Sequence, residues 1–284
     1  MPVRSDLALR AVASCALFLL LLSPALAENR AAELYKDNCA TCHGAERLGG
    51  SGPALLPESL TRLKKNMAGE IIAKGELATQ MPAFGDKLSS QEISALTAYI
   101  YTPPAIPPKW DAADIRASHV IITPIDSLPA QPVFDADPLN LFVIVETGDH
   151  HITILDGDRM EPIHRFPSHF ALHGGPKFTP DGRFVYFASR DGWITKFDLY
   201  SLQVVSEIRA GINTRNLAIS ADGKYVMVAN MLPHTLVALN ADDLSLLEVI
   251  PALDKSGHKS SRVSAVYQAA PHKSFIVALK DVAE

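Results

Sequence analysis

Cysteine is scarce in this chain, and several other features are missing. The 284 residues contain three cysteines, too few for a fold held together by disulfide bonds. The net charge is −5 and there is no block of basic residues, which argues against nucleic-acid binding. Beyond the N-terminus, no stretch is long and apolar enough to span a bilayer. The length allows more than one domain, so we expect a multidomain protein whose mature part has no transmembrane span.

The first 27 residues have the order of a secretory signal peptide. Arg4 and Arg10 form a basic region, residues 16–22 form an apolar core, and residues 25–27 form a small-residue cleavage site. This predicts removal of residues 1–27 and export, most simply to the periplasm. An alternative is lipid attachment at Cys15, which ends a sequence resembling a lipoprotein box. The main apolar run follows Cys15 instead of preceding it, which favours the cleavable signal peptide.

The two remaining cysteines lie in the sequence Cys39-Ala40-Thr41-Cys42-His43, which is typical of a c-type haem attachment site. Two thiols at this spacing can add to the two vinyl groups of a porphyrin, and His43 can then supply the proximal imidazole to the iron. The alternatives are a redox dithiol and half of a zinc site. A zinc site would need two more ligands, and the sequence has no second Cys pair. The motif therefore predicts covalent haem c.

Helical patterns surround this motif in residues 28–101. Residues 31–38 look helical and lead into the motif. Ser89 and Glu92 form a capping box before a run with helical apolar spacing, which should end before Pro103. Such terminal helices around one haem resemble the class I cytochrome c fold. We therefore expect residues 28–101 to form an all-α domain of this kind.

Met81 is the expected second ligand of the haem c iron. It lies on a Met-Pro loop before the capped helix, and small cytochromes c carry their distal Met on such a loop. A soft thioether suits iron and raises its potential. One alternative is that Met81 is an ordinary packing residue. The other is ligation by Met67, which lies in an expected helix over residues 60–72. The loop position favours Met81.

A proline-rich segment separates this domain from a repetitive region. Residues 102–118 begin with several prolines and are predicted to form a stiff, extended linker. In residues 119–284, a turn, an apolar strand, a short turn and an alternating strand recur about every 40 to 50 residues. The apolar strands of the four units start near Asp137, Asp181, Asp222 and Lys273. Short strands at this period are typical of β-propeller blades.

The repeats predict about four blades, of which the last is incomplete. A propeller has to close into a ring to cover the edges of its sheets. The sequence ends at Glu284, just after the strand that opens the fourth unit. We therefore interpret the sequence as a fragment of a longer protein, with an all-α domain followed by part of a β-propeller.

Several short sequences connect this arrangement to a known family. They are Tyr99-Ile100-Tyr101-Thr102-Pro103-Pro104, Asn140-Leu141-Phe142, Leu155-Asp156-Gly157-Asp158, Ala171-Leu172-His173, Ser189-Arg190-Asp191 and Gly211-Ile212-Asn213-Thr214-Arg215. Together with the exported cytochrome and the hinge, they resemble the cytochrome cd1 family. That family includes the cd1 nitrite reductases and the dihydro-haem d1 dehydrogenase of haem d1 biosynthesis, which the sequence resembles more. The resemblance implies an eight-bladed propeller that binds haem d1 non-covalently.

The resemblance also implies an iron ligand in the propeller. His173 matches the position of the proximal haem d1 ligand and lies in a Gly-Gly-containing turn before a blade. The alternative is a loop histidine without a partner. The adjacent His150 and His151 point to opposite faces of a strand or turn, which favours turn residues over a metal site.

Arginines are the expected partners of the haem d1 carboxylates, because the guanidinium group pairs with carboxylates through two hydrogen bonds. Arg190 and Arg215 match family arginines that face the cofactor. The alternatives are solvated turn charges or salt bridges within a blade. A third family arginine falls near Thr147, so that contact is expected to be absent here.

The resemblance implies three alternative functions. The first is oxidation of dihydro-haem d1 to haem d1, with electrons passing to haem c. The second is the nitrite reductase, in which electrons run from haem c to haem d1 and nitrite becomes nitric oxide. The third is a non-catalytic haem d1 carrier or electron-transfer partner. The short segment before Cys39 and the presence of Thr147 favour the dehydrogenase, whose catalytic acid and base stay unassigned. Expected partners are the haem d1 precursor or product, periplasmic electron-transfer proteins and a nitrite reductase that receives haem d1.

Overall fold

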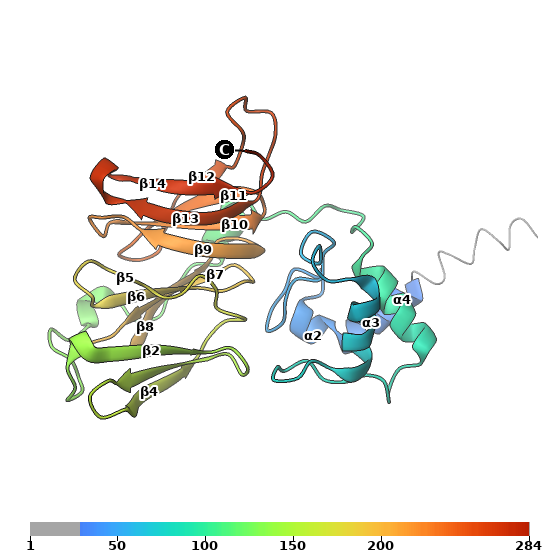
Figure 1. Cartoon of the computed structure of the whole chain (residues 1–284), viewed down its shortest axis with the longest axis horizontal. Coiled ribbons are helices and arrows are strands. Elements are labelled where there is room, and N and C mark those ends of the chain that lie inside the picture. The colour runs from blue at the N-terminus through green and yellow to red at the C-terminus, as the bar shows by residue number, and fades with distance from the viewer. Residues whose placement is uncertain (1–28, 284) are drawn as a thin grey trace, which may run out of the picture.

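A computed structural model of the chain describes residues 29–283 and shows two parts side by side (Figure 1). The expected signal peptide and the alternative lipidation site at Cys15 lie outside the described residues. The smaller part is helical and the larger one consists of antiparallel sheets. Within residues 29–283, no helix is both long enough and apolar enough to cross a membrane.

The helical part consists of a helix over residues 29–38, α2 (Ala40–His43), α3 (Lys65–Lys74) and α4 (Ser90–Ile100). The predicted capping box is confirmed: Ser89 Oγ accepts from the Glu92 amide, and the Glu92 carboxylate accepts from the Ser89 amide. The helices meet in a core that includes Tyr35, Ile72 and Leu96. This core lies beside the Cys-Cys-His motif, because Cys39 packs against it.

The helix expected over residues 60–72 begins later than the sequence pattern indicated. Residues 57–63 form turns, in which the Leu60 amide donates to the carbonyl of Leu56. Lys64 is extended, with φ −75° and ψ 145°, so that α3 starts only at Lys65. The apolar spacing continued across this break because Leu60 packs into the same core as the helix.

The segment between the two parts is partly helical. Residues 102–110 contain no helix or strand, but α5 (Ala112–Ala117) follows with a capping box formed by Asp111 and Asp114. Ile115 of α5 is buried in the core between two sheets of the larger part. After α5, β1 (Val120–Ile121) pairs with strand β8 (Gln203–Arg209). The end of the expected linker is therefore fixed to the sheets.

The larger part consists of four antiparallel sheets, which agrees with the predicted partial propeller (Figure 1). The first holds β2 (Leu141–Glu146), β3 (His151–Asp156) and β4 (Glu161–Pro167). The second holds β5 (Lys177–Phe178), β6 (Phe184–Ala188), β7 (Trp193–Asp198) and β8, with β1 at its edge. The third holds β9 (Asn213–Ile219), β10 (Tyr225–Leu232), β11 (Thr235–Asn240) and β12 (Leu246–Pro251). The fourth has only β13 (Val263–Ala269) and β14 (Ser274–Leu279).

Apolar side chains fill the spaces between neighbouring sheets. Short 3-10 helices lie at Ile125–Ser127, Pro138–Asn140 and Ala270–His272, outside these layers. Phe166 and Phe197 stack between the first two sheets, with ring centroids 4.3 Å apart. The Asn216 side chain on β9 bonds both the amide and the carbonyl of Val266 on β13. The sheets pack face to face, and this packing holds in place the loops between strands that lie towards the helical part.

Candidate functional site

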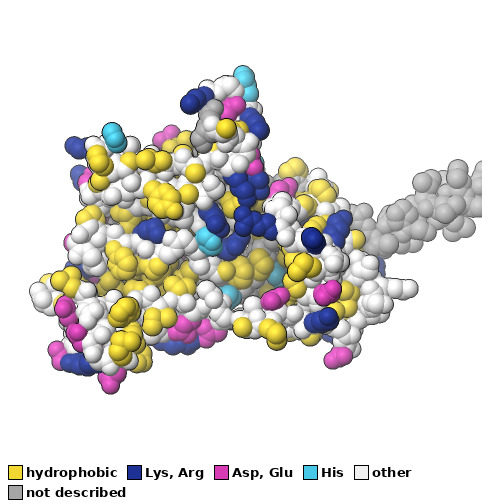
Figure 2. Space-filling view, in the orientation of Figure 1, with side chains coloured by type: hydrophobic (Ala, Val, Ile, Leu, Met, Phe, Trp, Pro, Cys, Tyr) yellow, Lys and Arg dark blue, Asp and Glu magenta, His cyan; other side chains and the backbone are white. Residues whose placement is uncertain are grey.

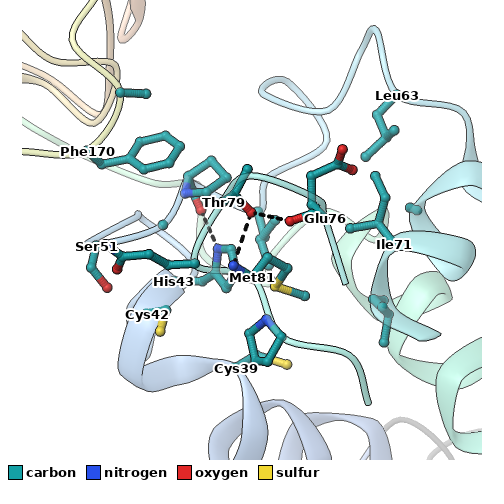
Figure 3. A pocket seen from close by; sticks show the side chains of 18 of the residues that line it. Cys39, Cys42, His43, Ser51, Leu63, Ile71, Glu76, Thr79, Met81 and Phe170 are labelled. Atoms are coloured by element: carbon teal, nitrogen blue, oxygen red, sulfur yellow. Dashed lines mark hydrogen bonds between the residues drawn. The ribbon is translucent and has the colours of Figure 1, made fainter. Parts of the chain in front are cut away.

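The Cys-Cys-His motif lines a cavity of about 480 Å³ (Figure 3). Cys39, Cys42 and His43 line it together with Met81, which comes from the loop after α3. Most of the remaining wall is apolar, as in typical cofactor sites. Met67, the alternative iron ligand, is 50% exposed on α3 and does not line this cavity.

The His43 ring is held in one orientation. Its Nδ1 donates a hydrogen bond to the carbonyl of Pro53 at 2.8 Å, so that Nε2 carries the lone pair. Burial lowers the pKa of His43, which keeps the ring neutral. Gly52 leaves room for the ring, because a Cβ atom there would lie 2.8 Å from His43 Cε1. A neutral imidazole with a free Nε2 has the form that binds iron.

The thiol of Cys39 is not poised for thiolate chemistry. Both cysteines are free thiols; Cys39 is the N-cap of α2 and Cys42 lies within that helix. Burial, followed by the nearby Cys42, raises the pKa of Cys39 to about 11. Redox dithiols and zinc sites depend instead on lowered thiol pKa values. Two thiols, a neutral imidazole and a thioether around an apolar cavity fit a covalent haem c.

The loop that carries Met81 is folded back on the end of α3. The Glu76 amide donates to the Met81 carbonyl at 3.2 Å, and the Met81 amide donates to Thr79 Oγ1 at 3.1 Å. Gly75 ends α3 with φ +74°, and a Cβ atom there would lie 2.8 Å from the Met81 carbonyl. These contacts hold the half-buried Met81 side chain against the cavity (Figure 3).

The larger part presents His173 at a cleft beside this cavity. His173 lies in the loop between β4 and β5, and its amide donates to the carbonyl of Ala188 at 2.7 Å. Its Nδ1 donates to the Arg215 carbonyl at 2.8 Å, which leaves Nε2 as the acceptor. The Arg215 guanidinium donates to this Nε2 at 2.7 Å. Burial lowers the pKa of His173, and the charges of Arg215 and Arg190 lower it further.

The structure brings Arg190 and Arg215 together with His173. Arg190 lies in the turn between β6 and β7, and Arg215 lies on β9. Desolvation and then the charge of Arg215 lower the pKa of Arg190, although its side chain reaches solvent. Within residues 29–283, neither arginine forms an ion pair with a carboxylate. Two such guanidinium groups repel each other and favour the binding of an anion.

Two further cations interact electrostatically with these arginines and were not found from the sequence. Arg62 lies in the helical part, and its charge lowers the pKa of both Arg190 and Lys280 after the larger effect of desolvation. Lys280 directly follows β14. Figure 2 shows Lys and Arg side chains gathered around a histidine over the hollow between the two parts. The nearby Lys64 and Lys65 are the sequence signal that could have drawn attention to Arg62.

The propeller also forms part of the wall of the first cavity. Thr147 and His150 from the turn between β2 and β3 line it, together with Phe170 and Ala171 from the loop that ends at His173. His150 lies in the expected turn, with φ +58°, and its buried Nδ1 has no hydrogen-bond partner. Thr147, the position at which the resemblance implies that a family arginine is absent, lies at this cavity.

Arg209 at the end of β8 connects the two parts. Its guanidinium group donates to the carbonyl of Leu48, which follows the haem motif, and to the carbonyl of Asp191 at 2.8 Å. The group lies 4.7 Å from the centre of the Trp110 ring, whose indole N–H donates to the Arg209 carbonyl. Burial lowers the pKa of Arg209. A small apolar cluster containing Leu56 and Trp110 surrounds this contact.

Comparisons with known families cover both parts of the chain. Residues 136–284 match the family described as cytochrome D1 heme domain. Residues 27–100 match the family described as cytochrome C oxidase, cbb3-type, subunit III. The second match confirms a cytochrome c domain at the N-terminal side, as the motif and the helices predicted.

Individual relatives agree with these matches. The chain is 63% identical to a dihydro-heme d1 dehydrogenase of Pseudomonas aeruginosa, over 88% of this chain and 51% of that protein. It is 24% identical to a nitrite reductase of Stutzerimonas stutzeri, over 89% of this chain and 49% of that protein. The solved structure of dihydro-heme d1 dehydrogenase NirN in complex with DHE is similar with a TM-score of 0.83 and 62% identity, covering 89% of this chain and 54% of that one. The chain thus spans about half the length of these relatives. It belongs to the cytochrome D1 heme domain family.

Proposed function

We propose that the whole protein oxidises dihydro-haem d1 to haem d1 and passes the electrons to haem c. The observation that carries this proposal is the position of His173. Its ligand nitrogen lies among the cationic groups of a cleft, and its loop leads directly to the cavity of the Cys-Cys-His motif. High identity to a dehydrogenase of this type supports the same reading.

In this proposal, residues of the helical part hold haem c. Cys39 and Cys42 form the two thioether bonds, and His43 and Met81 are the two iron ligands. When bound, haem c supplies a one-electron acceptor. The bond from His43 to the Pro53 carbonyl keeps Nε2 directed at the iron position.

The propeller residues hold the substrate. His173 is the proposed ligand of its iron, and the Arg215 guanidinium that now bonds Nε2 has to move aside. Arg190 and Arg215 then pair with the carboxylates of the substrate through charge-assisted hydrogen bonds. Arg62 and Lys280 add positive charge that acts on these arginines. Several cations facing one cleft suit a ligand that carries several carboxylates.

The reaction balance requires an external electron acceptor. The dihydro compound loses two electrons and two protons when it becomes haem d1. Haem c accepts one electron at a time, so the second electron passes either to the oxidised haem c of another protein molecule or to the same haem c after a one-electron carrier protein has reoxidised it. The group that accepts the protons is not assigned to any residue of this chain.

The proposal also assigns the parts of the chain and its cellular setting. Residues 1–27 direct export to the periplasm and are removed. Residues 28–101 form the electron-accepting domain, 102–118 the linker and 119–284 the ligand-binding part. The expected setting is haem d1 biosynthesis for denitrification. Periplasmic electron-transfer proteins and a nitrite reductase that receives haem d1 are the proposed partners.

Visible spectroscopy tests this function directly. Dihydro-haem d1 is added without oxygen to the whole protein with oxidised haem c, and spectra are recorded over time. We expect haem c reduction together with the haem d1 spectrum in the wild type and in the control H258A, whose histidine is exposed on another loop. H173A should bind and convert little. Unchanged conversion by H173A would overturn the role of His173, and nitric oxide formation from nitrite without conversion would indicate the reductase.

A further inference from the structure

The two cofactor sites are joined by one four-residue segment. Phe170 and Ala171 line the cavity of the Cys-Cys-His motif, and their side chains come from the propeller (Figure 3). His173 lies two residues further on and faces the cationic cleft. Three peptide units span at most about 11 Å when fully extended. The chain therefore connects the two sites by a short covalent route.

This segment is held against the neighbouring turn of the propeller. The Arg190 amide donates to the carbonyls of Phe170 and Ala171 at 3.3 and 3.1 Å. Leu172 pairs with Ser189 as an isolated bridge, and the His173 amide donates to the Ala188 carbonyl. The backbones of Phe170, Arg190 and His173 therefore belong to one hydrogen-bonded arrangement.

The backbone of the segment is strained at Ala171. Its φ of +43° lies in the left-handed region, which is unfavourable for a residue with a side chain unless the surroundings impose it. Here the two hydrogen bonds from Arg190 impose it. With this backbone conformation, Phe170 points towards the helical part and His173 lies at the cleft. Local backbone strain of this kind is typical of functional segments.

The Phe170 ring forms part of the propeller wall of the cavity. It lies against the His150 ring in an edge-to-face contact, with centroids 5.2 Å apart and planes at 71°. The Gln80 side chain, next to Met81, donates to the Asp149 carbonyl on the same turn at 3.2 Å. The propeller wall thus contacts the loop of the proposed iron ligand and keeps water from this side of the cavity.

We propose that Phe170 is a positioning residue that seals the haem c cavity and fixes the start of the shortest covalent path to His173. This rests on the proposed function, because the path matters only if electrons leave a substrate bound at His173. The electron enters the ferric haem c iron, which becomes ferrous, and the second follows after a one-electron carrier protein has reoxidised it. Exclusion of water by the ring disfavours the more highly charged ferric form and so raises the haem c potential.

The test compares two Phe→Leu variants of the whole protein with haem c attached. F170L removes the ring from the cavity wall. F142L is the control, because Phe142 is 50% exposed at the end of β2 that lies away from the turn over the cavity. The first measurement is the haem c midpoint potential by spectroelectrochemistry without any haem d1. The second is the rate of haem c reduction in a single turnover with dihydro-haem d1.

F170L should have a lower haem c potential than F142L. Its single-turnover rate should fall by about ten- to a hundredfold, as expected when the geometry of reacting groups loosens by about 1 Å. Equal potentials in the two variants overturn the proposal, and so does an equal rate in a protein that converts its substrate. If the wild type does not convert dihydro-haem d1, the proposed function fails, while the potentials still decide the role of Phe170.

Discussion

Replacing Gly52 by Ala tests the architecture around the proposed haem c ligand. A Cβ atom at this position would lie 2.8 Å from His43 Cε1 and 3.0 Å from Nδ1. Both distances are shorter than ordinary van der Waals contacts, so the ring has to move. The backbone of Gly52 does not lie in the left-handed region, so the effect comes from the methyl group alone.

The expected cost follows from the local packing. Overfilling a well-packed site costs about 1–3 kcal/mol. The shift also weakens the His43 Nδ1 bond to Pro53, and such a bond contributes about 0.5–1.5 kcal/mol. We therefore expect G52A to lose about 1.5–4.5 kcal/mol of stability in the cytochrome domain, from these two contributions. The ferric haem c should partly lose its six-coordinate, low-spin state.

The matched control is G69A in the same domain. Gly69 lies inside α3, where a Cβ atom would lie 3.4 Å from Thr97 Oγ1, an ordinary contact. Replacing a helical glycine by alanine should stabilise the domain by about 0.5–1 kcal/mol. Urea denaturation followed at the Soret band gives the two stabilities, and electron paramagnetic resonance gives the spin state. A G52A protein as stable as G69A, with unchanged low-spin spectra, would refute the reasoning.

Three further predictions concern other parts of the chain. Burial lowers the pKa of Lys196 from 10.5 to about 8. Between these two pH values the unfolded state binds more protons than the folded state, so the stability should rise with pH. K196M should lose this rise when urea denaturation is measured at both pH values. R209A should speed proteolysis within residues 102–108 by about ten- to a hundredfold, because it removes two charged hydrogen bonds. Each such bond contributes about 1.5–3 kcal/mol, and part of this loss weakens the contact between the two parts. The control R116A should be cleaved like the wild type. R62A should weaken dihydro-haem d1 binding by about three- to tenfold, as measured by titration, and this loss of affinity should be smaller at high salt. An unchanged affinity would show that Arg62 does not contribute to substrate binding.

Local patterns in the sequence were enough to predict the main features of both parts. The Cys39–His43 motif, the Met81 loop and the Ser89 capping box each depend on residues that are close in sequence. The repeated strands predicted the four sheets, because each strand pair is a hairpin or meander with its own apolar alternation. These features are local, so a single sequence contains what is needed to recognise them.

The contacts between the two parts could not be predicted in the same way. Arg209 bonds to Leu48 and Phe170 lines the cavity of Cys39, both across large separations in the sequence. The spacing of apolar residues in the sequence does not indicate such contacts, because they depend on how the two folded parts pack against each other. The early start expected for α3 was wrong for a related reason: apolar residues of the preceding turns pack into the same core and imitate helical spacing.

The most direct test of the proposed function is the stoichiometry of a single turnover. The whole protein with oxidised haem c is mixed anaerobically, in excess, with dihydro-haem d1, and the amounts of ferrous haem c and haem d1 are read from the same spectra. Removal of two electrons, accepted one per protein molecule, predicts two reduced haem c groups for each haem d1 formed. Formation of haem d1 without reduction of haem c, or binding without any conversion, would contradict the account.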